Sequence, residues 1–436
     1  MSSMLRVIAS LGISIACLGI SLPVYPQSAP LSVAQADADD FYDQGIDYSE
    51  QGEYSSAITS FDQAIRLDPT NANAYLYRGI AHAALGNYQM AIADYDQAIQ
   101  LAPDDAADAY FYRGVAYFEL GDDQQALASF EQATQLEPDY ADAYVYQGAI
   151  LASAGALEEA IASYTQAIDL DSRNGQAYLN RCSLYYQLGA QQAALADCNQ
   201  AVRFLPDSAT AYYNRGFVHS ARGSAQAALT DFHRAIRFKP DYAEAWLGRG
   251  LMRFSLGDRA GGLTDLDQAI VLRAEYPEAY RVRGDMHLAL NNVERAIDDY
   301  DQALRLNTEY AAAYRGRADA QQGLGDFRGA EQDYSRAIAL NANDLNAWLG
   351  RGQVQARLGS HQSAIDDFTK VIQVDPDNAD AYFYRGQSQS AIGQDTEAMS
   401  DLETAANLYL QKSETDRYRE VVREMNMIQY GFAPLP

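Results

Sequence analysis

The sequence predicts an all-α solenoid, in which one helical hairpin is copied along the chain and stacked. The first observation is a column of small residues that recurs every 34 or 35 residues, eleven times from Gly45 to Gly386. The second is an aromatic residue four positions before each of them, from Phe41 to Tyr382. The third is the i, i+4, i+7 spacing of apolar residues in each half-unit, which places them on one helix face. Self-similarity at this period is the signature of a repeat array.

The first 36 residues have the pattern of a secretory signal peptide. They contain no acid and one base, Arg6, followed by an apolar stretch and the small-residue motif that ends at Ala36. We expect cleavage after Ala36 and export to the periplasm or to a lumenal or extracellular compartment. Two alternatives stay open: an uncleaved segment that anchors the chain in the membrane, and a lipid attached to Cys17. Membrane contact is expected only through such an anchor or through partners.

Residues 37–412 form the array itself. A glycine seven positions after the small column, replaced once by Asn291, suits the positive φ that ends a first helix. A proline closes six of the eleven units and stops the second helix. Small residues let the two helices approach, and aromatic residues fill the space beside them. One extra residue near Asp104 predicts a longer turn between two of the units.

A final helix is expected over residues 413–430, where it would cap the open end of the stack. Stacked repeats need a terminal element with one polar face. An apolar stripe and a charged face alternate here as they would on one helix, and residues 431–436 are expected to be a tail. The apolar stripe consists of Tyr418, Val421, Val422, Met425 and Ile428.

These columns resemble the tetratricopeptide repeat, which has an aromatic, small, small, aromatic, small, proline pattern. The resemblance covers residues 38 to 412 and recurs in all eleven units, with conservative departures such as Gly262 and Leu266. It implies a right-handed superhelix whose first helices line the concave side. It also implies that partners are proteins or peptides.

By this resemblance, positions beside the aromatic column face the concave groove. They are apolar or aromatic in the first seven units and charged in units eight and nine, and the first seven lack the basic residues with which some family members grip chain-terminal carboxylates. The alternative is that these side chains pack between neighbouring repeats. The candidate groove residues are Tyr42, Leu76, Tyr77, Phe111, Tyr112, Tyr146, Asn180, Tyr213, Asn214, Phe217, Leu247, Arg281 and Arg315.

A covariation within the chain predicts ion pairs that join the two helices of one hairpin. The residue before the small column is Arg in nine units, and eight of these carry Asp sixteen residues later, while both units with Gln carry Ser instead. Only Arg113 with Ser129 departs from the rule. The predicted pairs are Arg78–Asp94, Arg181–Asp197, Arg215–Asp231, Arg249–Asp265, Arg283–Asp299, Arg317–Asp333, Arg351–Asp367 and Arg385–Asp401.

Cys182 and Cys198 replace the small residue and the second aromatic residue of one unit, so they should face each other across the hairpin. An oxidising compartment would permit a disulfide between them. The alternative is a pair of buried thiols.

Composition and motifs exclude several classes of function. Nucleic-acid binders need a basic surface, but the net charge is −27, the pI is near 4.4 and only three of the 32 bases are lysines. The chain lacks a phosphate-binding loop, a nucleophile elbow and zinc-ligand spacings. The acidic stretch at residues 375–380 lacks the glycine of a calcium loop. We therefore expect no enzyme, no cofactor and no metal site.

The favoured function is a non-catalytic, exported interaction scaffold that binds an extended peptide or a partner protein in its concave groove. An alternative is a substrate-recruiting or assembly subunit of a membrane or envelope machine whose chemistry lies in another chain. A third is a self-associating array. The sequence leaves the partner and the oligomeric state open.

Overall fold

The computed structural model describes residues 37–430, which form 23 α-helices, one short 3₁₀ helix and no strand. The all-α solenoid class is therefore confirmed. The predicted signal peptide, Cys17 and the tail at residues 431–436 lie outside the described residues. None of the helices between residues 37 and 430 combines the length and the apolar character that a membrane crossing needs.

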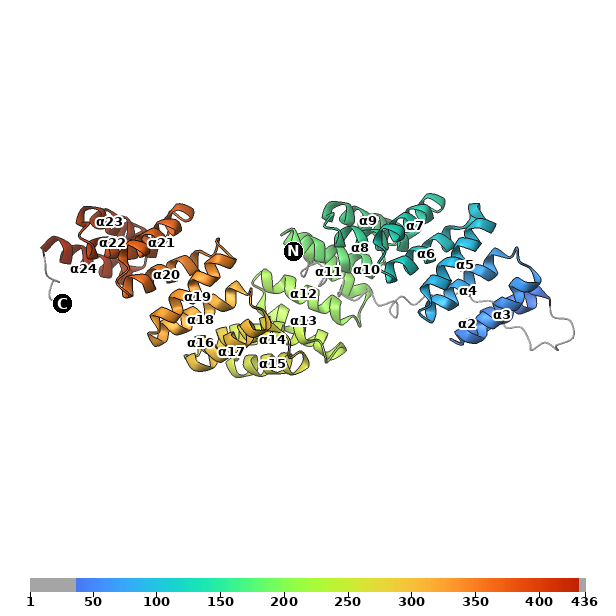
Figure 1. Cartoon of the computed structure of the whole chain (residues 1–436), viewed down its shortest axis with the longest axis horizontal. Coiled ribbons are helices and arrows are strands. Elements are labelled where there is room, and N and C mark those ends of the chain that lie inside the picture. The colour runs from blue at the N-terminus through green and yellow to red at the C-terminus, as the bar shows by residue number, and fades with distance from the viewer. Residues whose placement is uncertain (1–36, 431–436) are drawn as a thin grey trace. The chain divides into compact units, whose positions relative to one another are not determined.

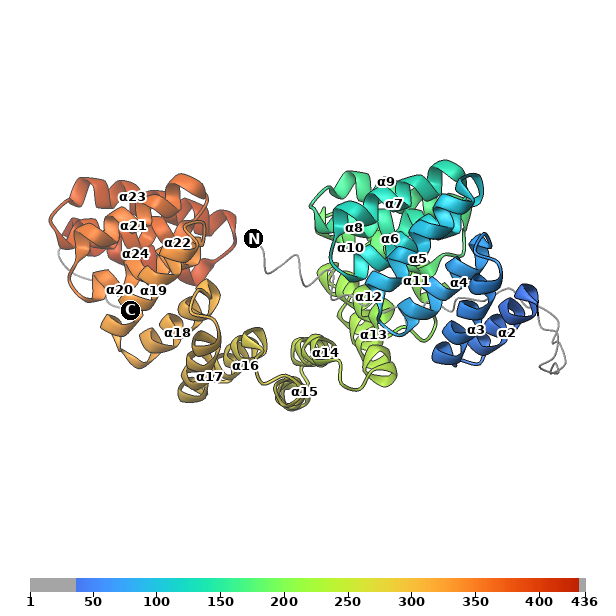
Figure 2. The ribbon, with the colours of Figure 1, turned by 45° about the vertical axis from the view of Figure 1, so that its right-hand side comes forward.

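The helices fall into two compact units, divided after Pro240, and each unit is a stack of helical hairpins in chain order (Figures 1 and 2). The first unit holds repeats 1 to 6. Its helices are α2 (Ala38–Glu50), α3 (Tyr54–Leu67), α4 (Ala72–Ala84), α5 (Tyr88–Leu101), η2 (Pro103–Asp105), α6 (Ala107–Glu119), α7 (Asp123–Leu136), α8 (Ala141–Ser153), α9 (Leu157–Leu170), α10 (Gly175–Gln187), α11 (Gln191–Phe204), α12 (Ala209–Ala221) and α13 (Ala225–Phe238).

The second unit holds repeats 7 to 11 and a final single helix. Its helices are α14 (Ala243–Ser255), α15 (Arg259–Leu272), α16 (Pro277–Ala289), α17 (Val293–Leu306), α18 (Ala311–Leu324), α19 (Phe327–Leu340), α20 (Leu345–Arg357), α21 (His361–Val374), α22 (Ala379–Ala391), α23 (Asp395–Gln411) and α24 (Thr415–Tyr430).

In seven of the eleven hairpins, a ring on the second helix lies against a glycine on the first. In repeat 2, a Cβ atom added to Gly79 would lie 2.6 Å from the Tyr95 ring, closer than any side chain tolerates. The alanine columns beside the ring are fully buried, as Ala91 shows. Burial of such a ring removes roughly 150–250 Å² from water, so the glycine and the ring together hold the two helices at close approach.

The turn inside each hairpin follows the predicted glycine column. Gly52 has φ +77°, and Asn291, the one exception in the sequence, has φ 60°. Asn is the residue that best replaces glycine in this left-handed conformation. The extra residue of repeat 3 is accommodated by η2, which confirms the predicted longer turn.

The last helix, α24, packs on the hairpin of repeat 11 (Figure 1). Val421 is fully buried there, and Tyr418, Met425 and Ile428 contact the same apolar cluster. The apolar stripe predicted for a capping helix is thus the face that covers the end of the stack.

Candidate binding surfaces

All eight predicted Arg–Asp pairs are present, which confirms the interpretation of the covariation. In each pair the Nε and Nη2 atoms of the arginine donate to the two carboxylate oxygens, at 2.5 to 3.0 Å. The exception also bonds across its hairpin, because Arg113 Nε donates to Ser129 Oγ at 3.2 Å. These two-point contacts fix the register of the two helices.

The same arginines join each repeat to the one before it, which the sequence did not reveal. Arg78 Nη1, for example, donates to Asp62 of the preceding hairpin at 2.6 Å, and its guanidinium lies 5.4 Å from the Tyr75 ring centroid. An arginine therefore bonds within its hairpin, bonds to its neighbour and stacks on an aromatic residue. The arginines that bond to the preceding repeat are Arg78, Arg113, Arg181, Arg215, Arg283, Arg317, Arg351 and Arg385.

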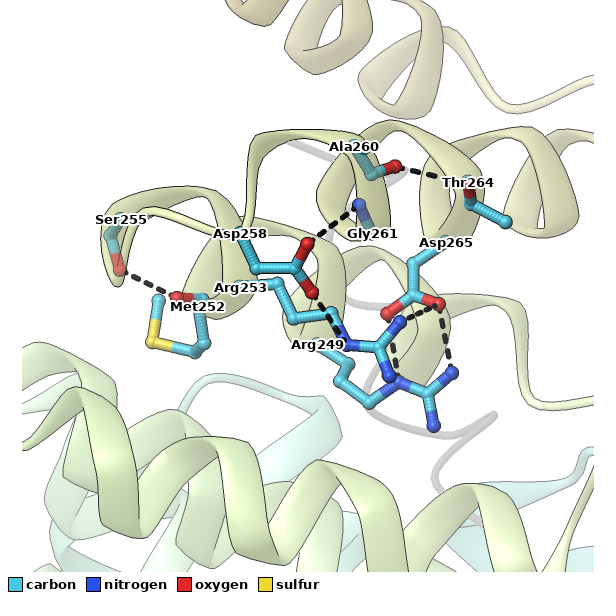
Figure 3. A network of polar contacts seen from close by, with 9 residues as sticks. All are labelled: Arg249, Met252, Arg253, Ser255, Asp258, Ala260, Gly261, Thr264 and Asp265. Atoms are coloured by element: carbon cyan, nitrogen blue, oxygen red, sulfur yellow. Dashed lines mark hydrogen bonds and ion pairs between the residues drawn. The ribbon is translucent and has the colours of Figure 1, made fainter.

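Repeat 7 carries the most buried pair, between Arg249 and Asp265 (Figure 3). The Asp265 carboxylate, 1% exposed, also accepts a hydrogen bond from Arg253 Nη1 at 3.1 Å. Figure 3 shows Asp258 at the end of the same network, where its carboxylate faces Arg253 and accepts from the backbone N–H of Gly261 at 2.9 Å. Two guanidiniums thus neutralise one buried carboxylate in this hairpin.

Tyrosines of the first helices in unit 1 fill the space between successive repeats. Tyr77 stacks on Phe61, and Tyr146 stacks on Phe130 at a centroid distance of 5.1 Å. Tyr146 is 3% exposed and Phe111 is 7% exposed. The prediction that these two side chains face a partner is therefore wrong, because rings of the neighbouring repeat already occupy their faces.

Other predicted groove residues lie half-buried on the first helices. Tyr42 contacts Phe61 and Tyr77, Leu76 packs beside Tyr95, and Tyr112 stacks on Tyr95 at 6.2 Å. These side chains keep part of their surface exposed while they pack against the adjacent repeat.

The two predicted asparagines also bond to neighbouring side chains. Asn180 accepts from Gln176 at 2.9 Å, and Asn214 donates to Ser183 at 2.9 Å. The Asn214 bond runs from α12 to α10, so this amide serves contact between repeats.

One exposed and two half-buried aromatic side chains lie together on α10 and α12, and we call them the Phe217 patch. Phe217 is 44% exposed, and its ring lies 5.2 Å from the Tyr186 ring and 6.0 Å from the Tyr213 ring between centroids. Of the predicted groove residues in unit 1, Phe217 and Tyr213 meet here. Tyr186 was not among the predicted residues, although it lies one turn beyond that column on α10.

In unit 2, Leu247 is half-buried in an apolar cluster, whereas the two predicted arginines belong to a polar network. Arg281 Nε donates to the Tyr310 hydroxyl at 2.7 Å and forms an ion pair with Asp285. Arg315 forms an ion pair with Asp344 at 2.9 Å. Each guanidinium is therefore already paired with a carboxylate of its own face.

Cys182 and Cys198 are fully buried and joined as a disulfide in the structure, with Cα atoms 5.4 Å apart. This separation lies in the range that a disulfide spans without movement of the backbone. The bond connects α10 to α11 at the positions where other hairpins place a glycine against a ring.

Within residues 37–430, no group of three or more His, Cys, Asp or Glu side chains is arranged to hold a metal ion. His82 and His287 occupy buried positions in the first helices. Burial lowers the pKa of both imidazoles, and Asp94 and Asp299 respectively oppose that effect. Both histidines are therefore neutral core residues near pH 7.

Comparisons with known families now agree with the geometry. Models described as "Tetratricopeptide repeat" and "TPR repeat" together match more than half of the chain. The chain belongs to the tetratricopeptide repeat family. The matched segments are residues 42–106, 107–140, 148–189, 183–223, 207–261, 284–325 and 315–373.

Of three solved structures compared with this chain, one has a TM-score above 0.5. A chain in the crystal structure of the APC/C hetero-tetramer Cut9–Hcn1 is 13% identical, with a TM-score of 0.53, 89% of this chain covered and 97% of that chain. Yeast Tom70 is 16% identical, with a TM-score of 0.44, and the match covers 90% of this chain and 96% of that chain. YrrB, described as having an unusual peptide-binding site, is 22% identical, with a TM-score of 0.37, and the match covers 42% of this chain and 95% of that chain. A comparison with curated protein sequences gave no match.

Proposed function

We propose that this tetratricopeptide repeat protein is a non-catalytic scaffold that binds an extended protein segment on the first helices of unit 1. The support is family membership, because stacked helical repeats commonly use their continuous concave surface for binding. The aromatic and arginine columns form contacts within and between repeats, so we expect binding to use the surface that the stacked helices present.

The observation that carries the proposal is the Phe217 patch. Phe217, at 44%, is the most exposed phenylalanine between residues 37 and 430, and two tyrosines lie beside it. Exposed apolar clusters with a polar rim mark interaction sites, and aromatic anchors contribute much of the binding energy at interfaces. We therefore expect an apolar side chain of the partner to pack on the exposed part of Phe217, beside Tyr186.

The test is site-specific photo-crosslinking of the protein in its own compartment. A photoreactive residue at Phe217 should crosslink to one contiguous segment of a partner. A photoreactive residue at Val271, which is 76% exposed on a second helix, is the matched control and should not. A synthetic peptide of the captured segment should then bind the purified protein, and Phe217→Ser should weaken that binding at least about tenfold, equal to ~1.4 kcal/mol.

The outcomes separate the three hypotheses for this chain. Equal crosslinking from Phe217 and Val271 would contradict a binding site on the first helices. Crosslinks from Phe217 to a second copy of this chain would favour the self-associating array. Crosslinks to a subunit of a membrane or envelope machine, with no binding of the isolated segment, would favour the recruiting subunit.

We also propose that the protein is exported and that Cys182 and Cys198 are oxidised there. Asp37 caps α2 through its side chain, so cleavage after Ala36 would place the first helix of the array at the new N-terminus. The two cysteines are placed for a bond that persists in oxidising compartments. Intact mass of the native protein should show a chain that begins at Asp37 and lacks two thiol hydrogens. A chain that keeps residues 1–36, or two free thiols, would contradict this proposal.

A further inference from the structure

Eight consecutive residues occur twice in the chain without a single change. Residues 107–114 at the start of α6 and residues 379–386 at the start of α22 both read Ala-Asp-Ala-Tyr-Phe-Tyr-Arg-Gly. The two copies occupy the same place in repeats 3 and 11. Because the sequences are identical, the neighbours of corresponding side chains can be compared directly.

In repeat 11 the octapeptide holds a guanidinium. Arg417 extends from α24 toward α22, and its Nη2 atom lies 2.5 Å from Asp380 Oδ1 and 3.5 Å from the Tyr384 hydroxyl. The guanidinium carbon lies 5.0 Å from the Phe383 ring centroid and 5.7 Å from that of Tyr384. The Tyr409 hydroxyl donates to the same Asp380 oxygen at 2.7 Å. A carboxylate and tyrosines thus surround one arginine side chain.

In repeat 3 the corresponding carboxylate and tyrosine, Asp108 and Tyr112, are present without an arginine. Asp108 accepts a hydrogen bond from the Tyr140 hydroxyl at 2.7 Å, as Asp380 does from its tyrosine. Among residues 37–430, no arginine, lysine or histidine forms an ion pair with Asp108 or with Asp142 of the next repeat. The Tyr140 ring stacks on Phe111 at 4.8 Å, so the side open to an incoming group is the one formed by Asp108, Asp142 and Tyr112.

The electrostatics of repeats 3 and 4 are those of an uncompensated anionic site. Burial raises the pKa of Tyr112 to about 12, and Asp108, Tyr77 and Asp142 add to the rise. Burial also raises the pKa of Tyr146, and Glu119 and Asp142 contribute. No positively charged side chain contributes to the pKa shift of either tyrosine.

We propose that Asp108, Tyr112 and Asp142 bind an arginine side chain of a basic, extended partner segment. The inference rests on the proposed function, because it names the chemistry of the segment that the first helices of unit 1 take. Arginine fits better than lysine because its planar guanidinium can bond to a carboxylate and stack on a tyrosine together. The strongly negative chain and the intramolecular precedent of Arg417 both favour a cationic occupant.

The test uses fluorescein-labelled (Ala-Leu-Arg)₄ and its neutral counterpart, in which citrulline replaces each arginine. Fluorescence anisotropy with the full mature chain at physiological salt should show the arginine peptide binding at least about tenfold tighter. Asp108→Asn, which removes the charge, and Tyr112→Leu, which removes the stacking ring, should each reduce that preference. Asp123→Asn, at an exposed position on α7, makes the same change in charge and should leave it unchanged. Circular dichroism and unfolding midpoints confirm that each variant is folded.

Three results would overturn the inference. They are equal binding of the two peptides, equal losses in Asp108→Asn and Asp123→Asn, and no binding of the arginine peptide. Any of these can coexist with specific crosslinking from Phe217, in which case the scaffold function stands and the arginine site does not. If crosslinking from Phe217 fails while the peptide preference holds, the Phe217 patch is not the binding surface, and the arginine site stands without it.

Discussion

Replacing Arg351 by methionine tests whether the arginine columns stabilise the array as buried ion pairs. Arg351 donates to both oxygens of Asp367 at 2.7 and 2.8 Å, and the Asp367 side chain is 6% exposed. Removing one partner of a buried pair leaves an uncompensated charge and costs about 3–5 kcal/mol. Because the arginine itself is 18% exposed, we expect a loss near the lower end, about 3 kcal/mol.

Arg249→Met is the matched comparison. Arg249 and Arg351 each bond to an aspartate at two points and lie over a tryptophan, at 4.5 and 4.9 Å from the ring centroids. The difference that matters for the charge left behind is Arg253, which also donates to Asp265 at 3.1 Å and remains in the variant. Since one guanidinium still faces the carboxylate, the loss should be about half as large, about 1–2 kcal/mol.

The assay is urea unfolding followed by tryptophan fluorescence. The only two tryptophans of the chain are Trp246 and Trp348, one beside each arginine under test. Variants in which one of the two tryptophans is replaced by phenylalanine show which hairpin gives rise to each fluorescence transition. A loss below about 1 kcal/mol for Arg351→Met would place the pair among exposed ion pairs and refute the reasoning. Equal losses in both variants would refute the compensation by Arg253.

The effect of pH follows from the carboxylate that remains in Arg351→Met. Burial already raises the pKa of Asp367, and Arg351 opposes that rise. Without the guanidinium, the folded-state pKa should move further above the unfolded value of about 3.9. A group with a raised folded pKa contributes stability below its unfolded pKa and loses it as pH rises through the folded pKa. The deficit of the variant should therefore be largest at neutral pH and shrink as pH falls toward 4.

Three further predictions concern packing. Reduction of the Cys182–Cys198 bond should cost about 3 kcal/mol, the loop-entropy value for a loop of this size, and an unchanged unfolding midpoint in dithiothreitol would contradict it. Gly148→Ala should destabilise the protein by about 1–3 kcal/mol, and Gly216→Ala should destabilise it less. The reason is that the added Cβ would lie 2.7 Å from the facing ring at Gly148 and 3.1 Å from it at Gly216. Thermal unfolding of the two variants checks this order. Arg417→Met should raise hydrogen exchange in α24 at least about tenfold, equal to ~1.4 kcal/mol, and leave exchange in α20 unchanged.

The repeat register could be predicted from the sequence because each column has one local cause. A glycine at position 79 and a ring at position 95 are required by the contact between two helices of one hairpin. The Arg–Asp pairs followed from covariation over sixteen residues, which also lies within one hairpin. Features of this range repeat eleven times, so the chain provides its own comparison.

The binding surface was harder to predict because contacts between repeats decide which side chains remain exposed. Tyr146 belongs to a column that faces the groove by resemblance, but the Phe130 ring of the preceding repeat covers it. The residue at the facing position of the preceding repeat could have indicated which of these side chains are covered. Tyr77 and Tyr146 each follow a repeat with phenylalanine at the facing position, while Asn214 follows Cys198. The division after Pro240 has no such signal, because the periodicity runs through it.

The acidic character of the chain follows from how its arginines are used. Of the 32 bases, 29 are arginines, and those of the small-residue column are committed to aspartates inside the stack. Acids on the first helices of unit 1, such as Asp108, are left without a counter-ion. A negative field accelerates encounter with basic segments and is screened by salt, whereas short-range contacts set the residence time. Association of an arginine peptide should therefore slow with added salt in every variant, while only Asp108→Asn and Tyr112→Leu should hasten its dissociation.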